Sequence, residues 1–104
     1  MALTRAAIMF NFRKALQQAD ELDDIANSLS RMAKSEFEGT MQNISINWKG
    51  ENARKYLAKG DRLQGDMYST ANSLHSIASD IRKVARKIYN AEIKALAIAE
   101  ARNY

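Results

Sequence analysis

Near the middle of the chain stands the stretch Asn47-Trp48-Lys49-Gly50-Glu51-Asn52-Ala53, which separates two long halves of helix-forming composition. It contains the only tryptophan and one of the four glycines, and the chain has no proline. Because glycine has no Cβ, it accepts the backbone angles of a tight turn. We therefore expect an all-α fold, a two-helix antiparallel hairpin in a single domain (residues 1–104). The predicted helices cover about 4–44 and 52–100, and the predicted turn covers 45–51.

The first half has apolar residues at steps of three and four, which is the pattern of one helix face. Thr4 is the expected N-cap, since its hydroxyl can accept a hydrogen bond from an amide of the first turn. Gly39 is the expected weak point, because glycine costs about 1 kcal/mol relative to alanine inside a helix. The predicted apolar face comprises Ile8, Phe12, Leu16, Ala19, Leu22, Ile25 or Ala26, Leu29, Met32 or Ala33, Phe37, Met41 and Ile44.

The second half carries a seven-residue apolar repeat, which predicts a gently left-handed supercoil. Seven positions of the repeat are expected to be the most buried and to pack within the bundle or dimer, at about 1.5–3 kcal/mol each on full burial. They are Leu63, Met67, Leu74, Ile77, Ile81, Val84 and Ile88. Gly60 and Gly65 also lie inside this half, where close contact with another helix would compensate for their low helix propensity.

A second, weaker apolar stripe runs beside this repeat. It comprises Tyr68, Ala71, Ala78, Ala85, Tyr89, Ile93 and Leu96. The small alanines would let another helix approach closely, so the stripe is interpreted as a partner surface. The alternative is a wide intramolecular core.

The turn itself offers a cap and an aromatic side chain. Ser45 or Asn47 is expected to cap the second helix through a side-chain oxygen. Trp48 supplies a large apolar ring with one indole N–H donor. Three residues of the following helix are expected to pack beneath the ring: Ala53, Tyr56 and Leu57. The alternative is that Trp48 is simply a core residue that closes the hairpin.

The composition excludes several kinds of site. Without cysteine the chain has no disulfide, thiol nucleophile or thiolate metal site. No metal-ligand cluster, phosphate-binding loop or nucleophile motif is recognisable, so we expect no metal, no cofactor and no enzymatic activity. His75 is the only histidine. Because Asp80 is too far along the helix to pair with it, a surface or packing role is favoured over catalysis.

The net charge of +4 is mild. The densest basic cluster is Arg82, Lys83, Arg86 and Lys87, for which a solvated helix face is the first interpretation. The second is a contact with an acidic stretch, such as residues 20–24, in the same or another molecule. Nucleic-acid binding comes third and is not expected, since no aromatic side chains interleave with the cluster.

The N-terminal apolar run is too short for a signal peptide, and no apolar stretch of about 18 residues could span a bilayer. We therefore expect synthesis in the cytoplasm. If the protein is exported, we expect export without a cleaved leader.

Taken with this architecture, the sequence Trp48-Lys49-Gly50, followed by Ala53 and Tyr56, resembles the WXG family of small type VII secretion proteins. The resemblance implies a helical hairpin that dimerises into a four-helix bundle, as a homodimer or a heterodimer. It also implies export from Gram-positive bacteria through a membrane ATPase, with Trp48, Gly50, Ala53 and Tyr56 contributing to a composite secretion signal. The membrane would be met only through that secretion machine.

One part of the family pattern is missing. Many members carry Tyr-x-x-x-Asp/Glu after the second helix, a signal read together with the partner's tryptophan corner. Here each tyrosine with a residue four positions later lacks the acid: Tyr56 is followed by Gly60, Tyr68 by Asn72 and Tyr89 by Ile93. Either a partner supplies the signal, or the chain is an accessory that escorts a larger effector of the LXG type. The alternative outside secretion is a cytosolic structural coiled-coil or scaffold module.

Overall fold

The computed structural model describes residues 4–102, and these residues form helices joined by one short turn. The elements in chain order are α1 (Arg5–Met32), the π-helical segment η1 (Ala33–Phe37), α2 (Glu38–Asn47) and α3 (Glu51–Ala101). The first three follow one another without a break and form a single arm, which packs antiparallel to α3. The expected all-α helical hairpin is therefore confirmed.

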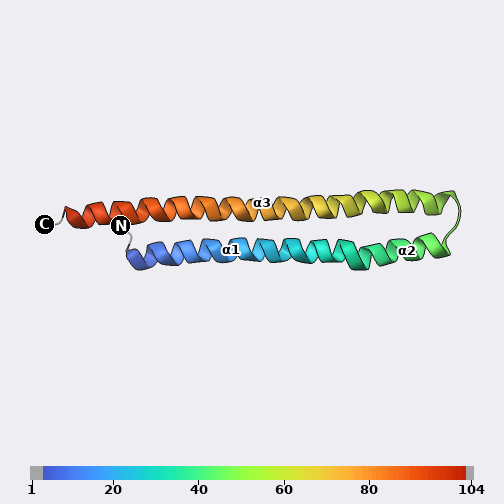
Figure 1. Cartoon of the computed structure of the whole chain (residues 1–104), viewed down its shortest axis with the longest axis horizontal. Coiled ribbons are helices and arrows are strands. Elements are labelled where there is room, and N and C mark those ends of the chain that lie inside the picture. The colour runs from blue at the N-terminus through green and yellow to red at the C-terminus, as the bar shows by residue number, and fades with distance from the viewer. Residues whose placement is uncertain (1–3, 103–104) are drawn as a thin grey trace. The chain divides into compact units, whose positions relative to one another are not determined.

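Tertiary contacts divide the chain into two compact units that share α1 and α3. The turn unit comprises residues 23–75 and contains η1, α2 and the first part of α3. Figure 1 shows α2, in green, passing through the short connection into the start of α3, which runs back beside it. The terminal unit comprises residues 1–22 and 76–104, and in it the blue start of α1 lies beside the orange part of α3. The expectation of a single domain stays a prediction.

The start of α1 follows the sequence closely. The backbone N–H of Ala7 donates to Thr4 Oγ1 at 3.1 Å, and the N–H of Ile8 donates to the Thr4 carbonyl at 3.0 Å. The hydroxyl thereby satisfies one of the amides that a helix leaves without an internal partner. Thr4 is confirmed as the N-cap.

The turn is shorter than predicted, because α2 continues to Asn47 and α3 already begins at Glu51. The expectation that Ser45 or Asn47 caps α3 is wrong, since both residues lie inside α2. The Asn47 Nδ2 instead donates to the carbonyl of Asn43 at 3.1 Å and to its side-chain Oδ1 at 2.6 Å. These asparagines extend the arm by closing its last turn with side-chain hydrogen bonds.

The π-helical segment was not predicted, although the spacing of apolar residues accounts for it. Leu29, Ala33, Phe37 and Met41 follow one another at steps of four. Over that interval an α-helix of 3.6 residues per turn rotates about 120° beyond three full turns, which would carry Met41 away from the other arm. The wider π turn absorbs extra residues and keeps Met41 buried. The irregularity therefore lies just before Gly39, the position that glycine propensity alone indicated.

Alanines form most of the interface between the arms. Two sets lie at seven-residue spacing and are nearly or fully buried: Ala19, Ala26 and Ala33 on the first arm, and Ala71, Ala78 and Ala85 on α3. Small side chains on both arms permit a short distance between helix axes. On the first arm this agrees with the predicted apolar face, with Ala26 and Ala33 buried in preference to Ile25 and Met32, which are about half exposed.

On α3 the predicted seam is wrong for the single chain. Leu63, Ile77, Val84 and Ile88 are 48–54% exposed, and Met67, Leu74 and Ile81 are only partly buried. The alanine stripe interpreted as a partner surface includes the buried seam, and the larger aliphatic stripe lies beside it. The physical reason is that small side chains permit a short distance between the helix axes. α3 therefore turns its alanines toward the first arm, although its larger aliphatic side chains carry the stronger hydrophobic signal.

The two glycines inside α3 have different surroundings, both within the turn unit. Gly60 is buried, and a Cβ added there would overlap the Sδ and Cε atoms of Met41. The close helix contact expected at Gly60 is therefore confirmed. At Gly65 a Cβ would meet no atom within 4 Å, so the same expectation is wrong there for the single chain.

Candidate interaction surfaces

The backbone of the turn accounts for the glycine at position 50. The φ angle of Gly50 is 99°, in a region that residues with a side chain rarely adopt. Its carbonyl accepts a hydrogen bond of 3.2 Å from the N–H of Arg54 and so begins α3. Trp48, on the other side of the turn, is extended with φ −109° and ψ 138°, and its N–H donates to Ile44 O at 2.9 Å.

The indole ring of Trp48 lies on the surface of this turn. Trp48 is 54% exposed and Tyr56 is 57% exposed. Their rings meet edge to face, with centroids 5.9 Å apart and an interplanar angle of 87°, an arrangement that aromatic pairs favour. Ala53 is buried instead. Gly50 thus forms the turn, Ala53 is buried, and Trp48 and Tyr56 form an exposed aromatic pair. The alternative that Trp48 is a core residue is wrong.

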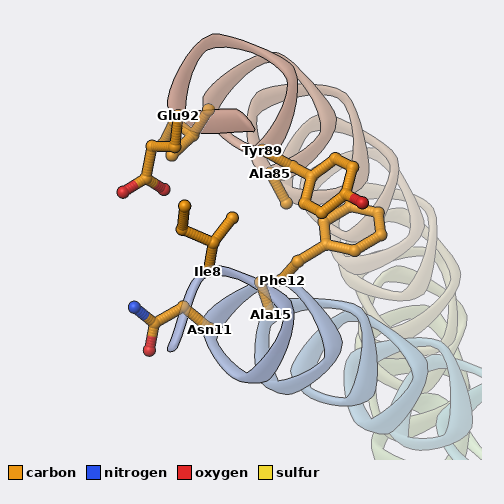
Figure 2. Close-up of a pocket in the computed structure, with 8 residues that line it drawn as sticks. Ile8, Asn11, Phe12, Ala15, Ala85, Tyr89 and Glu92 are labelled. Carbon is orange, nitrogen blue, oxygen red and sulfur yellow. The ribbon is translucent and has the colours of Figure 1, made fainter. Parts of the chain in front are cut away.

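A pocket of about 140 Å³ lies between α1 and α3 in the terminal unit. Figure 2 shows the rings of Phe12 and Tyr89 together on one side, with Asn11 and Glu92 on the other and Ile8 between them. The two ring centroids are 4.6 Å apart, with an interplanar angle of 31°. The wall of the pocket is therefore apolar, and its polar groups lie together at one rim.

This pocket continues into a wider groove on the same unit. The two hollows share Ala15, Ala85 and Ile88. The continuous surface, called the apolar groove from here on, is lined by Ile8, Asn11, Phe12, Ala15, Ile77, Asp80, Ile81, Val84, Ala85, Ile88, Tyr89 and Glu92. It includes four of the seven residues predicted to be buried in a bundle or dimer.

The basic cluster faces a separate hollow of the terminal unit, which it lines with Ser79 and Asn90. The Nη2 of Arg82 donates to Oδ1 of Asp20 at 2.8 Å. For this arginine, the interpretation as a contact with the acidic stretch of the same chain is confirmed. Lys83, Arg86 and Lys87 are exposed, as expected of a solvated face.

Sequence reasoning weighed only Asp80, on the same helix, as a partner for His75, and the structure places a partner on the other arm. In the turn unit, His75 Nδ1 is 2.6 Å from Oδ1 of Asp23. Both side chains are partly exposed. This contact joins α1 to α3, and no feature of the sequence around either residue indicates it, since the two positions are far apart in the chain.

A second polar contact between the arms lies at the π-helical segment. The Nε2 of Gln64 donates to the Ala33 carbonyl and to Glu38 Oε2, both at 2.8 Å. A π turn disturbs the regular pattern of backbone hydrogen bonds, and here a side chain from α3 binds a carbonyl of the disturbed turn. Sequence reasoning missed Gln64, since a lone glutamine on a helix carries no recognisable signal.

Residues 4–102 contain no group of three or more potential metal-ligating side chains. No helix in that part of the chain has the length and apolar character needed to cross a membrane.

Comparisons of this chain with family models, with curated proteins and with solved structures found no match.

Proposed function

We propose that this protein is a non-enzymatic component of a bacterial type VII secretion system, of the WXG type, which acts in a complex with another helical hairpin. The observation that carries the proposal is the exposed indole of Trp48 at the Gly50 turn. A large aromatic ring that contributes little to the core is costly to leave in water, and such residues are enriched where proteins bind one another. The ring is thus available to the export machinery.

The second support is the exposed aliphatic stripe of α3. Leu63 in the turn unit and Ile77, Val84 and Ile88 in the terminal unit remain about half exposed. Fully burying a side chain of this kind contributes about 1.5–3 kcal/mol, so covering the remaining half of each would stabilise a complex. A four-helix bundle covers such a stripe, with either a second copy or a different hairpin as the partner.

None of Tyr56, Tyr68 and Tyr89 is followed by an acid four positions later, which favours a division of labour within that complex. This chain contributes the tryptophan corner, and the partner contributes the tyrosine signal. The partner is a second small hairpin or the helical region of a larger effector that this chain escorts. The protein is made in the cytoplasm and leaves the cell through the type VII machinery.

The test compares secretion and stability of Trp48→Ala in the producing bacterium. Truncating a fully buried aromatic residue typically lowers the free energy of unfolding by about 3–5 kcal/mol. Because Trp48 is half exposed, Trp48→Ala should lower it by less than about 2 kcal/mol. Secretion into the medium should nevertheless be lost, as it should be when the type VII ATPase is deleted. Phe10→Ala is the matched control, since Phe10 is an exposed aromatic residue away from the turn.

Secretion that continues without the ATPase would refute the proposal. Retention of the protein in the cytosol, in wild-type cells and in cells without the ATPase alike, would favour the cytosolic scaffold instead. Normal secretion of the Trp48→Ala variant would show that Trp48 is not part of the secretion signal.

A further inference from the structure

The charged residues around the apolar groove differ from those of the unit that contains it. The terminal unit has nine lysines and arginines against five aspartates and glutamates, whereas the turn unit has seven of each. The net charge of +4 is therefore that of the terminal unit. Yet both charged residues that line the groove, Asp80 and Glu92, are acidic.

The basic residues of the same stretch of α3 face elsewhere. Arg82, Lys83, Arg86 and Lys87 line the separate basic hollow with two polar residues and no aliphatic one. One side of this helical segment is thus apolar with acidic margins, and another is basic without apolar side chains. A mixed surface would be expected if the charges served only solubility.

Asp80 and Glu92 are placed to contact the flanking residues of a helix that lies along the groove. Glu92 lies twelve positions after Asp80 on α3, or about 18 Å along the axis, and the two side chains point about 120° apart around it. They therefore lie on either side of the line through Ile77, Val84 and Ile88. A helix resting on that line would place its own flanking side chains against them.

The pocket at one end of the groove is large enough for a side-chain anchor. Its volume of about 140 Å³ is close to the ~150 Å³ of an engineered cavity that binds benzene. Glu92 on α3 and Asn11 on α1 lie on the same side of the pocket (Figure 2). An apolar side chain in the pocket would thus bring a lysine or arginine one turn away within reach of the Glu92 carboxylate.

We propose that the apolar groove of the terminal unit binds a helix of a partner protein whose apolar stripe is flanked by lysine or arginine residues. Apolar contact gives the affinity, and Asp80 and Glu92 select the partner by charge. Two copies of this chain meeting groove to groove would place four acids and no lysine or arginine around the shared apolar surface, so a different protein with basic flanks is the favoured occupant. The inference rests on the proposed function for the existence of a helical partner, but its test needs no secretion.

The test uses two designed helical peptides that share one leucine stripe and differ only in flanking residues, lysine in one and glutamate in the other. Binding to the full-length protein is measured by fluorescence anisotropy at physiological salt. The lysine peptide should bind about tenfold tighter or more, equivalent to about 1.4 kcal/mol. This preference opposes the effect of the protein's net charge of +4, which by itself favours the glutamate peptide.

Matched variants separate the groove from overall charge. Asp80→Asn with Glu92→Gln should abolish the preference, and Asp80→Lys with Glu92→Lys should reverse it. Glu21→Gln with Glu100→Gln changes the net charge of the same unit by the same amount at exposed residues outside the groove, and should leave the preference intact.

Three outcomes would overturn the proposal: equal binding of the two peptides, no binding of either, or an equal loss of preference in the Glu21 and Glu100 control. A stable homodimer that Val84→Lys dissociates would assign the groove to a second copy and would also overturn it. None of these results depends on export. Failure of the peptide test with intact ATPase-dependent secretion would thus refute the inference and leave the proposed function standing.

Discussion

The two glycines inside α3 provide a sharp test of how the arms pack. At Gly65 an added Cβ would meet no atom within 4 Å, and at Gly60 it would overlap the end of the Met41 side chain. Replacing either glycine by alanine should stabilise the helix by about 0.5–1 kcal/mol through backbone entropy alone. Gly65→Ala should show this full gain.

At Gly60 the same gain is opposed by overpacking. Inserting atoms into a well-packed contact typically costs about 1–3 kcal/mol. Met41 is a flexible side chain and can move in part, but it is buried against the other arm. Gly60→Ala should therefore be less stable than Gly65→Ala by about 1–3 kcal/mol, a difference of several degrees in Tm for a chain of this size.

The assay is denaturant and thermal unfolding followed by far-UV circular dichroism, at one fixed protein concentration because association would shift the apparent stability. Met41→Ala supplies the control. It removes the obstructing Sδ and Cε atoms, so in that background Gly60→Ala should stabilise by as much as Gly65→Ala does. Equal effects of the two substitutions in the wild-type background would refute the close contact, as would a penalty at Gly60 that persists without the methionine.

Other substitutions test the polar contact, the seam and the open stripe. Gln64→Ala should lower the free energy of unfolding by about 1–3 kcal/mol, because it leaves the Ala33 carbonyl without this partly buried donor; a change within ±0.5 kcal/mol in denaturant melts would contradict it. Ala78→Leu should cost at least about 1–3 kcal/mol by overpacking the buried seam. In the same melts Val84→Ala should cost less than about 1 kcal/mol, since Val84 is half exposed, and the reverse order of these two variants would place the seam on the other stripe.

Much of the fold follows from local features that act within a few residues. The turn requires a residue that tolerates a positive φ, and Gly50 is the glycine that lies between the two amphipathic stretches. Thr4 caps the helix that starts after it. The apolar steps of the first arm also predict its buried face, because the buried residues of that arm all belong to the predicted set: Ile8, Ala19, Ala26, Ala33 and Met41.

The face of α3 that meets the first arm could not be predicted from hydrophobicity. Two stripes lie side by side, and the larger side chains carry the stronger repeat. The matching alanine spacing on both arms, at Ala19 and Ala26 and at Ala71 and Ala78, was the available signal. Whether these alanines form the interface depends on the distance between the two helix axes, which is a property of the packed pair and not of either stretch of sequence.

The contacts between distant residues were likewise beyond a sequence argument. The pairing of His75 with Asp23 depends on the register between the arms. That register depends in turn on how many residues the π-helical segment absorbs. The exposure of Trp48 follows from the same geometry, since a turn of three residues leaves its ring beside Tyr56 on the surface.

Within the single chain, α3 buries its alanines against the first arm and leaves its larger aliphatic side chains exposed. Because the chain has no cysteine, single cysteines placed at Ala78 and Val84 can be compared by their rates of reaction with a maleimide in dilute protein. The account predicts that the cysteine at 84 reacts nearly as fast as in unfolded protein. The cysteine at 78 should react at least about a hundredfold more slowly, since it needs local opening of the arms. Faster reaction at 78 than at 84 would contradict the claim.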